Sequence, residues 1–325
     1  MGKAVVLHAT GGPEALSWED FEPGTPGPGE ALVAHEAVGV NFIDIYQRTG
    51  LYPLPKLPAV LGLEGAGVVE AVGEGVTEVA VGDRVAYAGG PPGAYAEKRL
   101  IPAHRLVPLP AFLSFHDAAS VMLRGMTARY LLKGCYPVGP ESVILVHAAS
   151  GGVGTLLTQW AHSLGATVIG TVGSEAKAVQ ARENGCDHVI LYREEDFVAG
   201  VREFTRGRGV DAVYDSVGQA TFLKSLDCLR PMGMMVSFGQ SSGSVEPFSP
   251  GLLASKGSLF LTRPSLMEYT RKREDLLAHA EDLFGVLEQG AVKAKINQEY
   301  PLREVGLAHS DLESRRTSGC TVLQV

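Results

Sequence analysis

The sequence predicts an α/β protein made of a mainly β domain and a second domain built on a doubly wound, parallel, six-stranded sheet. The first ~120 residues are rich in Gly and Pro and hold short alternating apolar stretches, which is typical of strands joined by tight turns. After Asp117, short apolar stretches alternate with helix-period segments, as parallel strands alternate with covering helices. We therefore place the mainly β domain at residues 1–122 and 264–325, and the doubly wound domain at 123–263.

The expected elements follow from these patterns in chain order. Strands of the mainly β domain are expected at 3–8, 30–40, 65–72 and 84–88. The strands of the parallel sheet are expected at 143–147, 167–172, 188–191, 212–215, 234–238 and 258–262, with helices at 118–133, 175–184, 196–205 and 221–229. Six strands in this alternation predict the sheet order 3-2-1-4-5-6. A charged helix at 268–289 and strands at 295–300 and 320–324 are expected to rejoin the first domain, because six strands already complete the sheet.

Composition argues against several classes of function. The net charge is −8, whereas a nonspecific nucleic-acid binder needs a basic face, so we expect no nucleic-acid partner. No apolar run approaches the ~18–20 residues of a membrane span, and the N-terminus shows a short strand pattern instead of a signal peptide. The four cysteines are single and widely spaced, which suits a reducing cytoplasm and argues against a disulfide framework.

A glycine-rich turn joins the first strand of the expected parallel sheet to the helix that follows it. The turn contains Ala148, Gly151, Gly152, Val153 and Gly154, in the pattern A-x-x-G-x-x-G. Gly151 permits a tight turn, Gly152 lets a phosphate approach the backbone, and Gly154 lets the helix pack closely on the strand. The free N–H groups and the dipole of the helix N-terminus favour negative charge, so the turn predicts a dinucleotide diphosphate site.

The residues after the second strand indicate which dinucleotide binds. NAD sites usually carry an Asp or Glu about 20 residues after the glycines, and the stretch from Thr171 to Ser174 has no carboxylate. Gly173 and Ser174 open the next helix, Lys177 lies one turn in, and Tyr192 follows the third strand. An N–H group, a hydroxyl and a cation fit a 2′-phosphate, so we expect NADPH. The alternative for Lys177 is an ordinary solvated helix lysine.

A family resemblance rests on motifs spread along essentially the whole chain. They are Gly62-Leu-Glu64-x2-Gly67-x5-Gly73-x2-Val76, Gly82-Asp-Arg-Val85, Leu145-x3-Ala149-Ser-Gly-Gly-x-Gly154-x4-Gln159-x2-His162, Gly185-Cys-Asp-His-Val-Ile190, Val210-Asp-Ala-Val-Tyr-Asp-Ser-Val-Gly218 and Leu302…Ala308-His309…Leu312-Glu-Ser-Arg-Arg-Thr317. Together they resemble the medium-chain dehydrogenase/reductase superfamily and, within it, the quinone oxidoreductase (zeta-crystallin-like) branch. The resemblance implies a GroES-like catalytic domain around an inserted Rossmann domain, and NADPH-dependent reduction of quinones. It also implies homodimers joined through the last Rossmann strand, near 258–263, which would otherwise be an exposed apolar sheet edge.

Two departures from the zinc-dependent members of the superfamily predict a site without metal. Asn41 stands where those enzymes have a cysteine ligand, and Leu63 stands where they have a histidine ligand. A leucine cannot bind zinc, and an amide is a poor ligand beside thiolate or imidazole. The cysteine-rich structural zinc lobe is also missing from the sequence. We therefore expect an acceptor that is already electrophilic, because no Lewis acid is predicted.

Residues that contact the reacting groups are expected near Asn41. Asn41 is our first candidate for the hydrogen-bond donor to an acceptor carbonyl, followed by Tyr46, Tyr52 and Arg263. The resemblance implies that Asn41 and Tyr46 lie near the nicotinamide and that Arg263 lies near the cofactor or the acceptor mouth. Simple aromatic packing is the alternative for both tyrosines.

Several other residues have one functional and one structural interpretation. Asp44 is expected to be a helix cap or a solvent-facing anion, and Glu64 is interpreted as structural because its zinc context is lost. Thr127 resembles a family residue that faces the nicotinamide, but its hydroxyl could also bond its own helix. By family analogy the strand ends contribute further cofactor contacts at Ser216, Phe238 and Gly239, with Ser241 and Thr317 as weaker candidates.

Two rival functions remain open at this stage. One is an NADPH-dependent reductase of α,β-unsaturated carbonyls, such as alkenals or enoyl thioesters, in which Tyr52 would deliver a proton. The other is a largely non-catalytic NADPH-binding or RNA-binding protein like some zeta-crystallin relatives. The acidic composition counts against the second rival.

Overall fold

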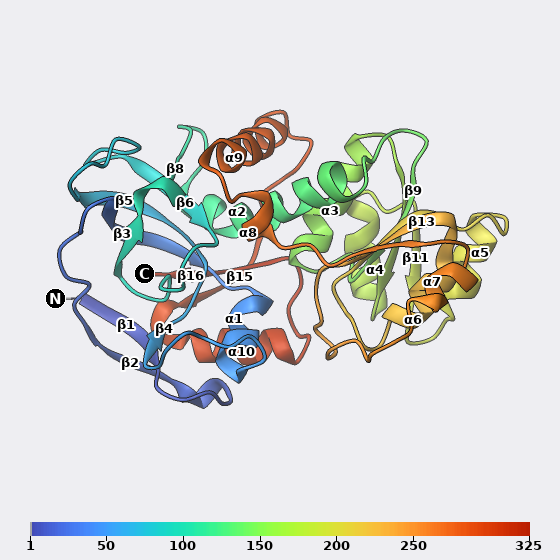
Figure 1. Ribbon diagram of the computed structural model, residues 1–325, viewed down its shortest axis with the longest axis horizontal. Coiled ribbons are helices and arrows are strands. Elements are labelled where there is room, and N and C mark those ends of the chain that lie inside the picture. The colour runs from blue at the N-terminus through green and yellow to red at the C-terminus, as the bar shows by residue number, and fades with distance from the viewer. Residues whose placement is uncertain (1) are drawn as a thin grey trace. The chain divides into compact units, whose positions relative to one another are not determined.

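The chain folds into two compact units, drawn in the computed structural model of Figure 1, which describes residues 2–325. Unit 1 comprises the N-terminal residues up to Met126 together with Thr270–Glu288 and Ala294–Val325, and unit 2 comprises Thr127–Tyr269 and Gln289–Lys293. The first boundary lies inside the continuous helix α2 (Phe115–Arg129), so no turn marks it in the sequence. The second lies after Tyr269, whose ring stacks on Tyr130 of unit 2 with centroids 4.7 Å apart. Along the chain, the boundaries between the units fall at 126/127, 269/270, 288/289 and 293/294.

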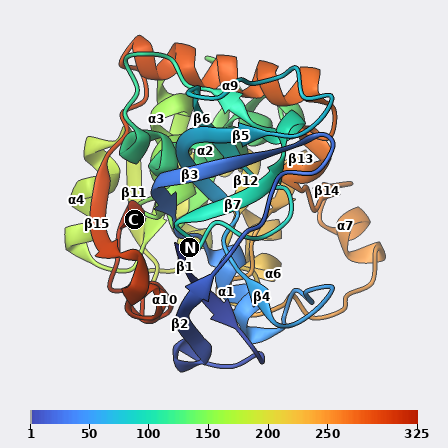
Figure 2. The same cartoon turned by 90° about the vertical axis from the view of Figure 1, so that its left-hand side faces the viewer.

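Unit 1 contains two sheets. Their strands are β1 (Gly2–Leu7), β2 (Leu16–Phe21), β3 (Glu30–Gly39), β4 (Ala59–Val60), β5 (Glu64–Val72), β6 (Arg84–Ala88), β7 (Lys98–Pro102), β8 (Val107–Pro108), β15 (Ile296–Pro301) and β16 (Cys320–Gln324). The smaller sheet has the order β2-β1-β4, and the larger has the order β15-β16-β3-β5-β6-β8, with β7 also paired to β3. Figure 2 shows β3 crossing this larger sheet. The last strand of the chain, β16, pairs antiparallel with β3, with Val322 opposite Gly39.

Four main helices accompany these sheets. They are α1 (Phe42–Thr49), α2, α9 (Arg273–Glu288) and α10 (Val305–Glu313), and single 3₁₀ turns lie at Pro13–Ala15, Ala103–Arg105 and Leu302–Glu304. α1 begins directly after β3, with Asn41 as its N-cap, and ends at Gly50, whose left-handed conformation (φ 83°) closes the helix. The core between these elements is apolar and closely packed, and Leu7, Leu61 and Ile101 are fully buried.

Unit 2 is the doubly wound domain. Its strands are β9 (Val143–His147), β10 (Thr167–Val172), β11 (His188–Leu191), β12 (Val210–Asp215), β13 (Leu229–Ser237) and β14 (Phe260–Thr262). Its helices are α3 (Gly152–Ser163), α4 (Glu175–Glu183), α5 (Phe197–Phe204), α6 (Phe222–Ser225), α7 (Gly251–Ser255) and α8 (Leu266–Tyr269), with a π-helix at Tyr130–Cys135 and a 3₁₀ turn at Leu226–Cys228. The sheet is parallel in the order β11-β10-β9-β12-β13-β14. This confirms the predicted fold class and the strand order 3-2-1-4-5-6.

The prediction of a single helix at 268–289 is wrong, because α8 ends at Tyr269 and a separate helix, α9, begins at Arg273. The carbonyl oxygen of the buried Thr270 accepts a hydrogen bond from Arg105 Nη1 at 2.7 Å. This carbonyl oxygen therefore accepts from a side chain of unit 1, and not from the backbone N–H that would continue the helix. The helix expected at 118–133 instead begins at Phe115 and changes to the π-helix at Tyr130, and the one expected at 221–229 shortens to α6 and a 3₁₀ turn.

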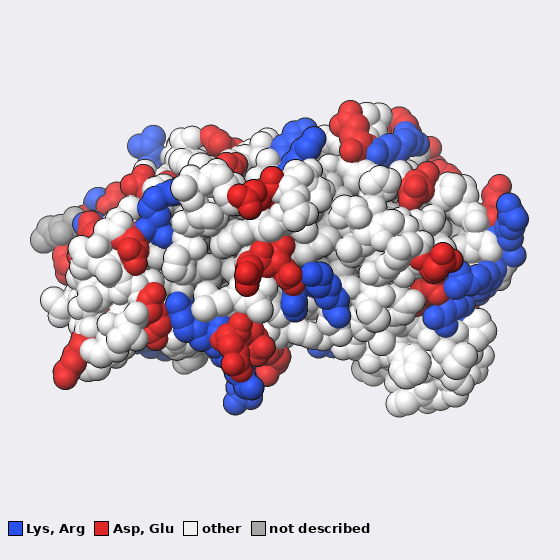
Figure 3. Space-filling model, turned by 90° about the horizontal axis from the view of Figure 1, so that it is seen from above, with Lys and Arg blue, Asp and Glu red and all other residues white. Residues whose placement is uncertain are grey.

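No helix among residues 2–325 is long and apolar enough to span a membrane. Acidic and basic side chains are interspersed on the face of the molecule shown in Figure 3, and they do not gather there into a basic patch. The charges on this one face do not form a basic surface of the kind that binds nucleic acid.

Candidate cofactor and reaction site

The glycine-rich turn of unit 2 has the geometry of a phosphate cradle. Helix α3 begins at Gly152, its N-cap Gly151 has no side chain to bond the first-turn N–H groups, and the first turn carries no acidic residue. These N–H groups have no partner within the helix and point out of its N-terminus, where an anion is favoured. Ala148 adopts a left-handed conformation (φ 53°), which explains why the usual fingerprint has glycine at this position.

Gly154 is required for close packing of α3 on β9. A Cβ atom at Gly154 would lie 2.2 Å from the carbonyl oxygen of Ala148 and 2.9 Å from the Cα atom of Ala149. Both are backbone atoms that cannot move aside without distorting the turn. The glycine at this position therefore serves the helix–strand contact, as the sequence predicts.

The residues expected to choose between NADPH and NADH lie around the N-terminus of α4. Ser174 is the N-cap of α4, and Lys177 is half-buried one turn later. A Cβ atom at Gly173 would lie 3.1 Å from the hydroxyl oxygen of Tyr192 and 3.4 Å from Arg193 Nε. Gly173 thus leaves room beside a hydroxyl and a guanidinium, and the structure brings Tyr192 to this corner as expected.

Two charged residues at this corner were not predicted from the sequence. Glu175 stands directly after Ser174, in the first turn of α4, where it would repel a phosphate. Its carboxylate is instead ion-paired with Arg182 of the same helix at 2.9 Å. Arg193, next to Tyr192, adds a cation near Gly173, and its position after a strand end was the available signal. The charge at this corner fits a 2′-phosphate.

The loops after β12 and β13 pack tightly against each other. A Cβ atom at Gly239 would lie 2.6 Å from the carbonyl oxygen of Ser216, and the same oxygen accepts the Ser241 N–H at 3.1 Å. Asp215 fixes the first loop, because its carboxylate accepts the N–H groups of residues 217 and 218 and the Thr221 hydroxyl. Ser216, Phe238, Gly239 and Ser241 are therefore gathered at the carboxyl ends of adjacent strands.

Three further candidates lie in separate segments. Arg263 follows β14 and donates to the carbonyl oxygen of Ser237 at 2.8 Å, which anchors its guanidinium beside the end of β13. Thr127 is buried in α2. Thr317 is buried in the loop that precedes β16 of unit 1.

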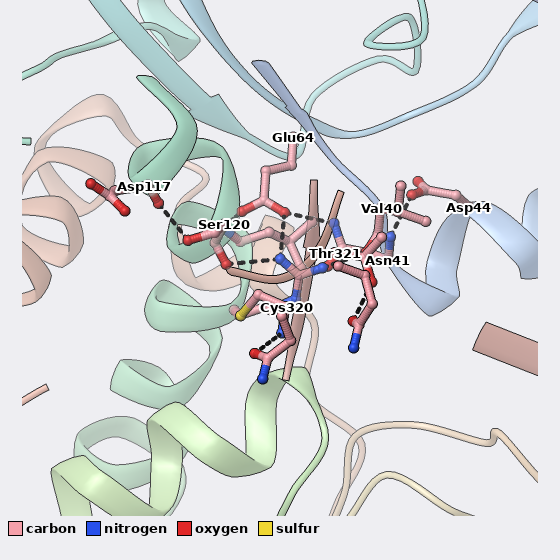
Figure 4. A network of polar contacts seen from close by, with 12 residues as sticks. Val40, Asn41, Asp44, Glu64, Asp117, Ser120, Cys320 and Thr321 are labelled. Carbon is pink, nitrogen blue, oxygen red and sulfur yellow. Dashed lines mark hydrogen bonds and ion pairs between the residues drawn. The ribbon is translucent and has the colours of Figure 1, made fainter. Parts of the chain in front are cut away.

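In unit 1, Asn41 is held by a buried ion pair (Figure 4). Its Nδ2 atom donates to Glu64 Oε2 at 2.7 Å, and Glu64 also accepts the Leu123 N–H at 2.7 Å and lies 3.4 Å from Arg124 Nη1. Arg124 also donates to the carbonyl oxygens of Ser120 and Val40. Glu64 is fully buried and Arg124 is 4% exposed. Burial raises the pKa of Glu64, whereas the charge of Arg124 and the two N–H donors act in the opposite direction.

The Glu64–Arg124 pair fixes the orientation of the side-chain amide of Asn41. A carboxylate only accepts hydrogen bonds, so the NH₂ group of Asn41 must face it. Oδ1 of Asn41 and the second amide hydrogen are then left for other partners. Glu64, interpreted as structural from the sequence, therefore orients the leading candidate for the reaction site.

Asp44 caps the helix that Asn41 begins. Its Oδ2 atom accepts the backbone N–H of Asn41 at 2.8 Å and the hydroxyl of Tyr95 at 2.9 Å. Asp44 is fully buried, so of its two expected roles the structure supports the cap and not the solvent-facing anion. Burial raises the pKa of Asp44 to about 7, because the two hydrogen bonds compensate only part of the lost hydration.

The two tyrosines near Asn41 pack on each other. The ring centroids of Tyr46 and Tyr52 lie 5.1 Å apart, and the Tyr52 N–H donates to the carbonyl oxygen of Tyr46. Tyr46 is buried and Tyr52 is half-buried. Leu63, at the former zinc position, is also buried, and no group of three or more His, Cys, Asp or Glu side chains among residues 2–325 is arranged to hold a metal ion.

Comparison with known proteins agrees with this arrangement. Residues 27–111 match the family described as "Alcohol dehydrogenase GroES-like domain", and residues 152–279 match "Zinc-binding dehydrogenase". The chain is 49% identical over 323 residues to a quinone oxidoreductase of Pseudomonas aeruginosa, with 99% of each chain covered. The chain belongs to the quinone oxidoreductase family. This confirms the family resemblance and the GroES-like and Rossmann domains that it implies.

Two further relatives, one of them a solved structure, are similar to this chain over nearly its whole length. The crystal structure of Escherichia coli quinone oxidoreductase complexed with NADPH superposes with a TM-score of 0.98 at 46% identity, covering 99% of this chain and 100% of that one. A 2-haloacrylate reductase from Burkholderia is 45% identical over 329 residues, covering 99% of both chains. The family therefore includes enzymes named for quinones and one named for a haloacrylate.

Proposed function

We propose that this chain is a zinc-independent NADPH:quinone oxidoreductase. The observation that carries the proposal is the buried Glu64–Arg124 pair, which holds Asn41 where zinc-dependent relatives have a metal ligand. The Asn41 side chain is thus fixed by a hydrogen bond to Glu64. Leu63, next to Glu64 in the sequence, offers no ligand atom for a metal. The quinone oxidoreductases among its full-length relatives support the same acceptor class.

We further propose that unit 2 binds the cofactor through the residues named above. The turn from Ala148 to Gly154, with Gly151, Gly152 and Val153, would hold the diphosphate. Gly173, Ser174, Lys177 and Tyr192 would hold the 2′-phosphate, and Ser216, Phe238, Gly239, Ser241, Arg263 and Thr127 would hold the nicotinamide half. Asn41, Tyr46 and Thr317, all in unit 1, are separate candidates for cofactor contacts. The acid-free first turn of α3 and the open corner at Gly173 support the phosphate assignments.

NADPH, when bound, supplies a hydride, and reduction of a quinone to the hydroquinone also takes up one proton. The negative charge that develops on a quinone is delocalised, so hydrogen bonds can stabilise it without a strong acid. Asn41 can offer its second amide hydrogen to the acceptor carbonyl. Tyr46 and Tyr52 form an aromatic surface against which a flat ring can pack.

A panel of acceptors tests this function. Stopped-flow oxidation of NADPH by the purified protein should be fast with benzoquinone and naphthoquinone, and slow with crotonaldehyde and crotonyl thioester. Asn41→Ala should lower kcat with quinones, and a chelator should leave the rate unchanged. Fast oxidation by the aldehyde or thioester without oxidation by quinones would contradict the proposal.

The similarity to the 2-haloacrylate reductase favours a second candidate, the reduction of α,β-unsaturated carbonyls. That reaction delivers hydride to one carbon and needs a proton at its neighbour, for which the half-buried Tyr52 is the candidate donor. Adding 2-chloroacrylate to the panel tests it directly. In this case Tyr52→Phe should abolish reduction of the chloroacrylate while quinone reduction persists.

We also propose a cytoplasmic homodimer joined through β14. β14 is an edge strand of its sheet, and it exposes Phe260 and Leu261 by 57% and 37% of their surfaces. An exposed apolar edge of this kind invites pairing with a second copy. All four cysteines are free, which suits a reducing compartment. Sedimentation velocity should show a dimer that Phe260→Asp converts to monomers.

A further inference from the structure

A row of buried hydrogen bonds joins α1 to α10 within unit 1. The hydroxyl oxygen of Tyr95 lies 2.9 Å from Asp44 Oδ2 and 2.9 Å from His309 Nε2. His309 Nδ1 lies 3.3 Å from Arg48 Nη1, and Arg48 Nη2 donates to Glu313 at 2.7 Å. The first four of these residues are at most 1% exposed, whereas the side chain of Glu313 is 35% exposed. The row therefore runs from the cap of α1 to the protein surface.

The directions of these hydrogen bonds follow from the chemistry of their ends. A guanidinium only donates, so His309 Nδ1 accepts from Arg48. Burial lowers the pKa of His309 to about 3, so its ring is neutral and its single proton is on Nε2. Nε2 then donates to the oxygen of Tyr95, and Tyr95 donates its own proton to Asp44. From Arg48 Nη1 through His309 to Tyr95, each donor thus points toward the carboxylate of Asp44, whereas Arg48 Nη2 points the other way, to Glu313.

The carboxylate at the end of this row is unevenly satisfied. Oδ2 accepts from both Tyr95 and the backbone N–H of Asn41, whereas Oδ1 is buried and has no hydrogen-bond partner among residues 2–325. Of the nearby charges, Glu64 disfavours ionisation of Asp44 and Arg124 favours it. The ionised form of Asp44 therefore depends on two donors, the Asn41 N–H and the Tyr95 hydroxyl, and a substitution can remove only the second.

We propose that Tyr95 and His309 are positioning residues for Asn41, and that Asp44 transmits their effect to the backbone of Asn41. When Asp44 is charged, its bond to the Asn41 N–H is charge-assisted, and protonation of Asp44 weakens it. Asn41 is then held less firmly at the start of α1. The inference rests on the proposed function, in which Asn41 contacts the reacting groups.

Tyr95→Phe tests this role, with Tyr87→Phe as the matched control. The Tyr87 hydroxyl bonds a different buried histidine, His35, at 2.7 Å. Loss of the donor from Tyr95 should raise the pKa of Asp44 further above its value of about 7. The ionised fraction at pH 7 then falls, so kcat with benzoquinone at pH 7 should fall severalfold and the acid limb of its pH profile should move to higher pH.

A second measurement follows Asp44 directly in the protein without cofactor. Carbon-13 NMR of protein labelled at the aspartate carboxyl carbons should show one resonance titrating near pH 7, and Asp44→Asn should remove it. Tyr95→Phe should shift this titration to higher pH, whereas Tyr87→Phe should not. Fluorescence titration should give the same Kd for NADPH in both variants within about twofold, because an effect on Asn41 alone leaves most cofactor contacts intact.

His309 provides an independent pair of variants should Tyr95→Phe fail to fold. His309→Leu removes the donor to Tyr95 and should move the pH profile in the same direction. His309→Gln can both accept from Arg48 and donate to Tyr95, so it should restore the profile. Equal effects of Tyr95→Phe and Tyr87→Phe, or an unshifted Asp44 titration, would overturn the positioning role. Full activity of Asn41→Ala would overturn the proposed function of Asn41 instead.

Discussion

Asp44→Asn should change how the stability of the protein depends on pH. The asparagine keeps an oxygen for the Asn41 N–H and the Tyr95 hydroxyl, but it cannot ionise. The pKa of Asp44 is about 7 in the folded chain, against an ordinary value of 3.8. Between these values the folded chain binds one proton more than the unfolded chain, so the free energy of unfolding falls as pH rises. The stabilising proton is fully present below the lower value and is lost as pH rises through about 7.

The expected size of this effect follows from linkage. Each pH unit between the two pKa values is worth about 1.4 kcal/mol, and the slope flattens as pH approaches 7. From pH 5 to pH 7, the free energy of unfolding of the wild type should therefore fall by about 2 kcal/mol relative to that of Asp44→Asn. Taking the difference removes the opposite contribution of the buried His35, whose pKa is lowered by burial to about 4 in both proteins.

Urea unfolding at pH 5, 6 and 7, followed by circular dichroism, measures this difference. Asp117→Asn is a suitable control, because Asp117 lies in the first turn of α2 and its hydrogen bond to Ser114 is exposed. Its stability curve should run parallel to that of the wild type. If the stability curve of Asp44→Asn also runs parallel to that of the wild type, the reasoning is refuted, because Asp44 would then stay ionised down to pH 5.

Three other variants test separate parts of the structure. Arg124→Met leaves Glu64 buried without its counter-charge and should lower the free energy of unfolding by about 3–5 kcal/mol, and adding Glu64→Gln should recover part of this loss; no recovery in a urea titration would contradict the pairing. Ala148→Gly relieves a left-handed alanine and should leave stability unchanged or raise it by up to about 1 kcal/mol, so a clear drop in Tm would count against the strain. Lys177→Ala should raise the KM for NADPH roughly tenfold or more and leave the KM for NADH unchanged, and an equal effect on both would remove its assigned role.

The parallel sheet could be predicted almost completely from sequence. β9, β10 and β11 have the predicted bounds, because each is a short apolar run that ends at Gly, Ser or polar residues. β2 and β7 were missed, since charged residues interrupt the apolar alternation in Leu16–Phe21 and Lys98–Pro102. These strands are held by pairing with β1 and β3, which no local pattern reveals.

The candidate site was predictable only where a local motif marks it. The turn from Ala148 to Gly154 carries its own signal, since strand, glycines and helix follow one another along the chain. The Glu64–Arg124 pair and the bond between Tyr95 and His309 join residues far apart in the chain, so their partners could not be found by spacing. Glu64 was interpreted as structural, but its burial, which requires a partner for the carboxylate, is known only from the structure.

The position of β16 ties the start of α1 to a segment far away in the sequence. β16 pairs with β3, and the Val40 N–H donates to the carbonyl oxygen of Thr321, so the residue before Asn41 is anchored by Cys320–Gln324. A truncated protein that ends before Cys320 leaves this edge of β3 unpaired. Such a protein should lack reductase activity even when unit 2, all of which lies before Ala294, still folds.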